Sequence, residues 1–317
     1  MSTSTSRTLI EHWNGTNWAV VPSPNAGNQN NFLYGIAGSP GTVWAVGSYA
    51  NATDGRLEVL VEHWNGSKWS LVSAPNVGSG HNYLSAVTAV SPGDVWAVGS
   101  HMDGGSETLI EHWDGLRWTV VDSPNAAKYD ALTAVTAVSA TDVWAAGWYF
   151  DATNQELRTL TEHWDGTGWS LVASPNVGAG NNQLWGIAAV PSKNVWAVGE
   201  REKSPGILRT LIEHWDGNEW HVVASPNPGT GDNRLFGVAR VSSNYVWTVG
   251  LYSNSSTTQA LIERWNGQKW SVTSGAGVGT SNRGLAAVAT VPRSTRTFAV
   301  GWRQSVGPPR TLIERHC

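Results

Sequence analysis

The stretch Thr210-Leu-Ile-Glu-His-Trp-Asp-Gly-Asn-Glu-Trp220 decides the fold of this chain, because close copies of it recur along the whole sequence. The glutamates of successive copies are spaced 49 to 51 residues apart. A fixed period in this range is typical of a solenoid, a propeller or an array. Six copies end in Trp and a seventh, altered copy closes the chain: residues 8–13, 59–64, 108–113, 159–164, 210–215, 260–265 and 311–316.

One repeat reads as four short strands without helical periodicity, at 184–190, 195–199, 210–215 and 219–224. A turn at 191–194 and a variable polar loop at 200–208 separate the first three strands. Asp216-Gly217 predicts a two-residue hairpin of type I′, which requires positive φ at both residues. Pro226 ends the repeat, because proline cannot join a strand ladder.

Four antiparallel strands per repeat predict an all-β chain that forms a six-bladed β-propeller. We expect a single domain over residues 1–317, with a flexible tail at 1–7. The N-terminus supplies two outer strands and the C-terminus two inner strands, so the ends should close the propeller by sharing one blade. Residues 311–316 are a spare strand, and either this segment or 8–13 could complete the shared blade.

Composition excludes several functional classes. Charged residues are 14% of the chain and the net charge is −4, without the basic stripe of a nucleic-acid binder or a membrane patch. Residues 1–7 lack the apolar core of a secretion signal, and no apolar run reaches the roughly 20 residues of a membrane span. We therefore expect a monomer that acts in the cytoplasm as the chain stands, or outside the cell if a signal was removed.

The segment His-Trp-Asp/Asn-Gly-x-x-Trp, preceded by Val-Trp-Ala-Val-Gly, resembles the Asp-box repeats of sialidase-like and related bacterial propellers. In that family the motif is structural, so the resemblance implies a fold and no activity. Glu-His-Trp-Asp-Gly-x-x-Trp also looks like a segment of six-bladed fucose-binding lectins, in which a glutamate, an arginine and a nearby tryptophan hold the sugar. The resemblance implies sugar contacts for Glu11, Glu62, Glu111, Glu162, Glu213 and Glu263, although the preceding strand has no arginine.

Residues that recur in every repeat are expected to serve the scaffold. The histidines that follow the repeated glutamates are too far apart to share one metal ion, so we expect hydrogen bonds within and between blades, with the glutamate fixing the tautomer. Most of the twenty tryptophans should be core, each burying about 150–250 Å². If the outer ones are partly exposed, they would instead be platforms for stacking sugars.

A nearly uniform polar position precedes the first strand of each repeat. We expect these residues to cap turns, and the alternative is a ring of oxygen ligands for Ca²⁺ or a sugar. No metal or other cofactor is otherwise predicted. The ring consists of Asn31, Asn82, Asp130, Asn182 and Asn233.

Positions that vary while their neighbours stay fixed are candidates for a ligand site. They lie beside the first strand and directly after the second, and they are rich in aromatic residues with a few charges. An apolar concavity with few polar groups is the usual form of a binding site. The candidates are Tyr34, Tyr49, His101, Trp148, Tyr149, Trp185, Glu200, Arg201, Phe236, Tyr252, Trp302 and Arg303.

These observations favour a propeller that binds a carbohydrate or small molecule in an aromatic pocket, with repetition adding avidity. An alternative is a metal-independent enzyme acting on a small molecule, with Glu200, His101 or Asp130 as acid or base, oriented by Tyr149 and Arg201. A sialidase activity is not expected, because no arginine triad occupies matching blade positions. The third interpretation is a scaffold for protein interactions.

Overall fold

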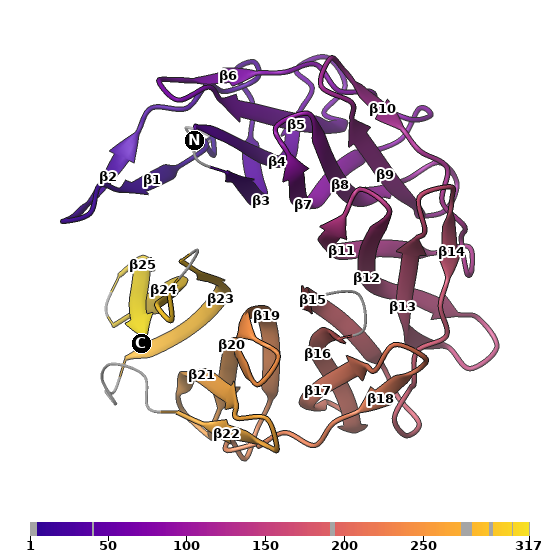
Figure 1. The fold of residues 1–317 in the computed structure, drawn as a ribbon, viewed down its shortest axis with the longest axis vertical. Helices are drawn as coiled ribbons and strands as arrows, with labels where there is room; N and C mark the ends of the chain where they lie inside the picture. The colour runs from indigo at the N-terminus through magenta and orange to yellow at the C-terminus, as the bar shows by residue number, and fades with distance from the viewer. Residues whose placement is uncertain are drawn as a thin grey trace. The chain divides into compact units, whose positions relative to one another are not determined.

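The computed structural model describes residues 5–39, 41–190, 194–273, 281–291, 294–305 and 307–316. These residues form strands and no helix, and the predicted class, an all-β chain of the six-bladed propeller type, is confirmed. Strands that follow one another in sequence are neighbours within each sheet, as the arrows in Figure 1 show. The four-stranded sheets are β3 (Asn31–Ser39), β4 (Thr42–Ala50), β5 (Leu57–Trp64), β6 (Trp69–Leu71); β7 (Asn82–Ser91), β8 (Asp94–His101), β9 (Glu107–Trp113), β10 (Trp118–Val120); β11 (Asp130–Ser139), β12 (Asp142–Asp151), β13 (Glu156–Trp164), β14 (Trp169–Leu171); β15 (Asn182–Val190), β16 (Asn194–Ser204), β17 (Ile207–Trp215), β18 (Trp220–Val222); and β19 (Asn233–Ser242), β20 (Tyr245–Ser253), β21 (Thr258–Trp265), β22 (Trp270–Val272).

The two ends of the chain form smaller sheets. β1 (Ile10–Trp13) pairs with β2 (Trp18–Val21), and β23 (Asn282–Thr290) pairs with β24 (Thr297–Gln304), which pairs with β25 (Arg310–His316). The C-terminal strand β25 thus takes the third position of this sheet, for which the sequence offered both 8–13 and 311–316. Among the described residues β1 pairs with β2 alone, so the strand pairing does not reproduce the expected sharing of a blade.

The chain divides into two compact units, Met1–Ala145 with His163–Ser170, and Ala146–Glu162 with Leu171–Cys317. The expectation of a single domain stays a prediction. Residues 1–4 of the expected tail lie outside the described residues. The rest of the tail is held, because Arg7 donates a hydrogen bond to the carbonyl oxygen of Gly27 and the backbone N–H of Ser6 donates to Asn30.

The hairpin between the third and fourth strands differs from the predicted type I′ turn. Trp215 pairs with Trp220, so four residues form the loop instead of two. Gly217 has a φ of 102°, but Asp216 is not among the residues with positive φ. Its carboxylate instead accepts hydrogen bonds from the backbone N–H groups of Asn218 and Glu219, at 2.9 and 3.0 Å. The side-chain cap therefore replaces the second left-handed residue.

Tryptophan and histidine side chains join neighbouring sheets. Trp196 is almost fully buried. Its ring centroid lies 4.3 Å from that of His214 in its own sheet, and 5.0 and 5.3 Å from those of Trp265 and Trp270 in the next sheet. Equivalent clusters surround Trp44 and Trp96. The scaffold role expected for these tryptophans is confirmed, and their recurrence explains most of the tryptophan content.

The histidines are held by the residue that begins the second strand of the same sheet. His112 Nε2 lies 2.8 Å from Asp94, and the equivalent distance from His214 to Asn194 is 2.9 Å. The expected partner, the preceding glutamate, was wrong, because neighbouring residues of a strand point to opposite faces. The side chains of Glu111 and Glu213 are fully buried in the packing of the sheets.

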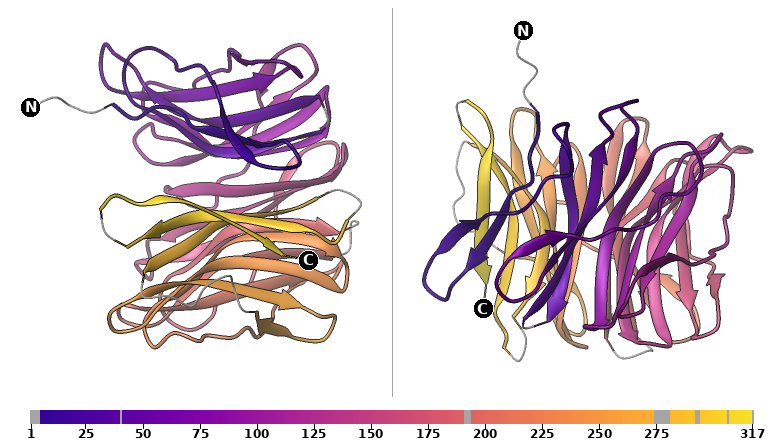
Figure 2. Two further views of the ribbon diagram at one scale, coloured as in Figure 1. Left: turned by 90° about the vertical axis from the view of Figure 1, so that its left-hand side faces the viewer. Right: turned by 90° about the horizontal axis from the view of Figure 1, so that it is seen from above.

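Within each unit, consecutive sheets pack face to face through their first strands. Figure 2 shows the yellow sheet β23–β25 against the orange sheet β19–β22. Gly237 allows this approach, since a Cβ there would lie 3.0 Å from the backbone of Ala287. The loops are also tied across sheets: the backbone N–H of Leu208 donates to Asp232 at 3.0 Å, and that of Thr258 to Asn282 at 2.9 Å.

Candidate functional site

A charged and aromatic group in the second unit lies where strands β15, β16 and β19 end. Glu200 of β16 pairs with Gln183 of β15, and the next pair along the two strands is Gly199 with Leu184. Arg234, on β19 of the next sheet, places its Nε atom 3.2 Å from the Glu200 carboxylate. The indole N–H of Trp185 lies close enough to the same carboxyl group to lower its pKa, but it does not meet hydrogen-bond geometry. We call Trp185, Glu200 and Arg234 the Glu200 cluster.

The Glu200 cluster combines a buried acid with an accessible base. The side chain of Glu200 is 5% exposed, whereas that of Arg234 is 37% exposed. Burial raises the pKa of the Glu200 carboxyl, the Asp232 carboxylate adds to this rise, and Arg234 and the Trp185 indole oppose it. A guanidinium has five N–H donors, so one contact with Glu200 leaves Arg234 with donors to offer outward.

A second aromatic position lies on the next sheet of the same unit. Arg234 pairs with Leu251, and the equivalent pair on β23 and β24 is Gly284 with Trp302. A Cβ on Gly284 would lie 3.0 Å from the indole nitrogen of Trp302 and 3.3 Å from Leu251. The missing side chain at Gly284 therefore lets the Trp302 ring lie over the sheet beside Leu251.

Strand alternation separates residues that the sequence grouped together. Arg201 pairs with Asn182 and Arg209, so it points to the face opposite Glu200. Arg303 and Trp302 are separated in the same way, as are Trp148 and Tyr149 on β12. A single surface therefore cannot hold both members of each adjacent pair.

The remaining aromatic candidates of the second unit are half-buried. Phe236 lies on β19 at an irregularity of the strand register between Leu235 and Gly237. Tyr252 packs on the loop before β19, where a Cβ on Gly229 would lie 3.1 Å from its ring. Tyr252 therefore contributes to the packing of its sheet.

In the first unit the candidates lie in separate local settings. Tyr34 is exposed and stacks on Phe32 with ring centroids 6.3 Å apart. The hydroxyl of Tyr49 donates to Glu58, and burial together with this carboxylate raises the pKa of Tyr49 to about 12. His101 lies 3.7 Å from Glu107. The sequence interpretation missed Glu58 and Glu107, which are recognisable only as cross-strand partners of the candidate residues.

The polar ring before the first strands is engaged in turn capping. Asn82 accepts a hydrogen bond from the backbone N–H of Val77 and donates to the carbonyl oxygens of Val77 and Gly80. The backbone N–H of Ala127 donates to Asp130, and burial raises the pKa of that carboxyl. Asn31, Asn182 and Asn233 make equivalent bonds.

Asp130 is therefore bound to its own loop and has no contact with solvent. This setting disfavours it as a catalytic acid or base. His101 and Asp130 belong to the first unit, while Tyr149, Glu200 and Arg201 belong to the second. In the part of the chain that the structure describes, no three His, Cys, Asp or Glu side chains gather in a way that could hold a metal ion.

Five of the six repeated glutamates cannot hold a sugar as the lectin resemblance implied, whereas Glu11 of β1 is half-buried and its sugar contact stays a prediction. Glu62, Glu111, Glu162, Glu213 and Glu263 are fully buried between sheets. A ligand approaching from solvent would have to open the sheet packing to reach them. The lectin resemblance therefore does not extend to these contacts.

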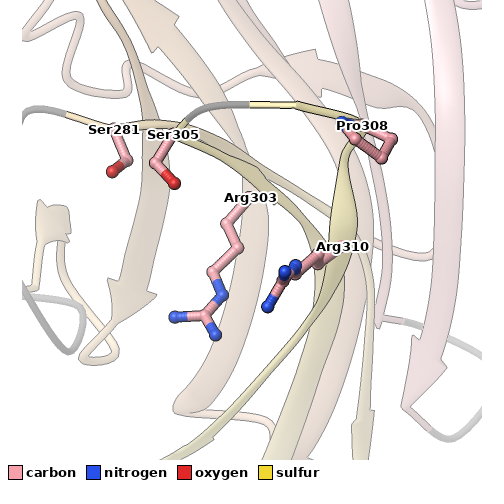
Figure 3. A pocket seen from close by; sticks show the side chains of 5 residues that line it. All are labelled: Ser281, Arg303, Ser305, Pro308 and Arg310. Carbon is pink, nitrogen blue, oxygen red and sulfur yellow. The ribbon is translucent and has the colours of Figure 1, made fainter.

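A cavity of about 220 Å³ lies elsewhere in the second unit, at the connection between β24 and β25. Figure 3 shows its lining side chains, with the guanidinium groups of Arg303 and Arg310 side by side. Of these residues the sequence interpretation had identified Arg303 alone. Arg310 was missed because it belongs to a repeated Arg-Thr-Leu-Ile-Glu segment and looked like scaffold.

None of the described segments forms a helix with the length and apolarity that a membrane crossing requires. No protein-family model matches the sequence, and a search of curated protein sequences finds no match. Solved structures do resemble the fold.

Three similar structures illustrate the range of functions on this fold. YCF48 bound to D1 peptide superposes with a TM-score of 0.56 at 11% identity, over 94% of this chain and 84% of that one. A polysaccharide lyase, an ulvan lyase of family PL25 bound to -[GlcA(1-4)Rha3S]-, gives 0.55 at 10% identity over 94% and 83%. Trypanosoma rangeli sialidase in complex with sialic acid gives 0.54 at 9% identity over 98% and 57%. At these identities the likeness establishes a shared propeller fold, in agreement with the sialidase-like resemblance of the repeats.

Proposed function

We propose that this chain binds carbohydrate at the Glu200 cluster of its second unit, with Trp302 on the neighbouring sheet extending the surface. The observation that carries the proposal is the ion pair between Glu200 and Arg234, which bridges two sheets beside a tryptophan. A protein-interaction scaffold and a metal-independent enzyme are the alternatives.

The scaffold does not require this ion pair. The position of Glu200 is Ser48, Ser100, Leu251 or Trp302 in other sheets. The position of Arg234 is occupied by Phe, Tyr, Gln or Gly in the paired strands. Those sheets pack without a charge at either position, so the charges in the second unit are available to serve a ligand.

The chemistry of the cluster suits a sugar. Arg234 offers N–H donors to hydroxyl oxygens, while the buried Glu200 carboxyl holds its guanidinium in place. The half-buried indole of Trp185 presents a large apolar face, on which the C–H face of a pyranose ring can stack. Two of the structural relatives are bound to a sulfated or acidic saccharide, which supports the proposal.

The test is a screen of the purified chain on an array of neutral and acidic oligosaccharides, followed by calorimetry with the best binder. We expect Trp185→Ala to lower affinity by about tenfold, equivalent to about 1.4 kcal/mol. The matched control is Trp215→Ala, another half-buried tryptophan of the same unit that lies at a hairpin. An array without binders, or equal affinity in Trp185→Ala and the parent, would contradict the proposal. Turnover of a bound oligosaccharide would instead support the enzyme alternative.

A further inference from the structure

The cavity between β24 and β25 is lined by two arginines, Arg303 and Arg310, that lie directly opposite each other on the two strands. Arg303 of β24 pairs directly with Arg310 of β25, and on its other side with Arg283 of β23. Residues directly opposite on antiparallel strands have Cβ atoms about 4.5–5.5 Å apart, and like charges at such positions are destabilising. Three arginines thus form a row across one sheet.

No carboxylate compensates the charge of the two arginines that line the cavity. Within the described residues, Arg303 and Arg310 take part in no ion pair and no side-chain hydrogen bond, and both are exposed. Acidic partners accompany arginines elsewhere in the chain, as Glu58 does Arg56 and Glu156 does Arg158.

The repeat itself supplies a comparison for Arg310. Arg209 occupies the same position in the sheet β15–β18, where it pairs with Arg201. Its guanidinium donates hydrogen bonds to the carbonyl oxygens of Leu208 and Gly231, at 2.9 and 2.6 Å. Arg209 therefore has a scaffold role, whereas Arg310 faces the cavity with its donors available.

The cavity has the size and the lining of an anion site. Its volume of about 220 Å³ far exceeds the roughly 10–15 Å³ that a single water needs. Hydroxyl groups of Ser281 and Ser305 add donors to those of the arginines (Figure 3). The side-chain amide of Gln304, next to Arg303 and Ser305, donates to the carbonyl oxygen of Gly307 at 2.9 Å.

We infer that Arg303 and Arg310, with Ser281 and Ser305, form a site for the oxyanion group of an acidic saccharide, either a carboxylate or a sulfate ester. Paired guanidinium groups bind such planar or tetrahedral oxyanions through parallel N–H···O contacts. The volume admits more than an inorganic ion, so the oxyanion is expected to be a substituent of a larger molecule. The saccharide part of this inference rests on the proposed function.

The experiment measures calorimetric affinity for size-matched neutral, uronate-bearing and sulfated oligosaccharides, with inorganic sulfate as a separate ligand. Arg303→Gln/Arg310→Gln should weaken binding of the acidic oligosaccharides by about tenfold or more and leave neutral ones unchanged. Arg303→Lys/Arg310→Lys keeps the charge but loses the planar geometry, so it should restore little of the affinity. Arg315→Gln removes an exposed charge from the same strand and should behave as the parent.

The outcomes separate this inference from the proposed function. If neutral oligosaccharides bind through Trp185 and acidic ones gain nothing from Arg303 and Arg310, the oxyanion site is refuted while carbohydrate binding stands. If the double glutamine variant loses acidic ligands but Trp185→Ala changes nothing, the Glu200 cluster is refuted instead. If inorganic sulfate binds as tightly as the sulfated oligosaccharide, the ligand is a free oxyanion and the saccharide assignment is overturned.

Discussion

Replacing Glu111 by glutamine should reduce the pH dependence of this protein's stability. Glu111 is fully buried on β9, and neither carboxyl oxygen has a hydrogen-bond partner within the described residues. Burial raises the pKa of Glu111 to about 8, whereas a glutamate in an unfolded chain has a pKa of about 4.3. Between these pH values the folded protein keeps a proton that the unfolded chain has lost.

The sign and size of the effect follow from proton linkage. Because the folded state binds the extra proton, the free energy of unfolding falls as pH rises, by about 1.4 kcal/mol per pH unit for each such group. This stability is fully present below about pH 4.3 and is lost as pH rises through the folded-state pKa. Over the whole window one glutamate removes on the order of 5 kcal/mol. Glu62 and Glu263, with pKa values raised to about 7 and about 8, act in the same direction.

The assay is urea unfolding of the parent chain and Glu111→Gln at several pH values between 5 and about 7.5, a range chosen to lie inside that window. Burial of the amide contributes an amount that does not vary with pH, so the slope of stability against pH is the diagnostic quantity. We expect the slope of Glu111→Gln to be less steep by about 1.4 kcal/mol per unit. Glu219→Gln changes a carboxylate that lies mostly in solvent and is the control. Equal slopes for Glu111→Gln and the parent would refute the reasoning.

Two further predictions concern the scaffold and a tyrosine. Gly199→Ala should destabilise the fold by about 1–3 kcal/mol or more, because a Cβ would lie 1.9 Å from the carbonyl oxygen of Gln183. Gly168→Ala is the control and should leave stability unchanged, because a Cβ there meets nothing within 4 Å. Thermal unfolding of the two variants measures the difference. Glu58→Gln should lower the pKa of Tyr49 from about 12 towards its ordinary value, since the Glu58 carboxylate contributes to the rise. An ultraviolet titration in which that pKa stays unchanged would show that burial alone sets it.

The fold could be predicted because the same local pattern of strands and turns recurs in successive repeats. Val195-Trp-Ala-Val-Gly199 is one such strand, and it lies within β16 as expected. Repetition averages out ambiguous residues, so the number and order of strands followed from the sequence. The turn type did not, because Asp216 can satisfy the loop by accepting two backbone N–H groups instead of adopting positive φ.

The identity of the third strand in the last sheet was beyond sequence reasoning for a different reason. Residues 8–13 and 311–316 share Thr-Leu-Ile-Glu, so local preference is the same for both segments. The choice depends on chain connectivity: β25 reaches β24 through a short loop, which has a small closure entropy. Strand propensity contains no information about such a competition.

The sequence named candidate site residues without their arrangement, and the strand register shows which of them share a face of the sheet. Glu200 and Arg201 are adjacent in sequence and point to opposite faces of the sheet. Glu200 and Arg234 are far apart in sequence and are 3.2 Å apart in space. Single-sequence reasoning named Trp185 and Trp302 as candidates, but the residues that surround them depend on sheet-to-sheet packing that periodicity does not encode.

Recurrence separates scaffold from site better than burial or charge does. A buried glutamate without a hydrogen bond is unfavourable wherever it occurs, yet Glu62, Glu111 and Glu263 place one at the same position of three sheets. A cost that every repeat shares is compensated by the packing that every repeat shares. The same cross-strand arginine pair recurs as Arg201 and Arg209, but there two backbone carbonyl oxygens accept from Arg209, whereas Arg303 and Arg310 have no such partner among the described residues. An arrangement that one repeat alone leaves without a partner points to a ligand that supplies the missing charge, and the same reasoning applies to a favourable but unnecessary pair such as Glu200 and Arg234.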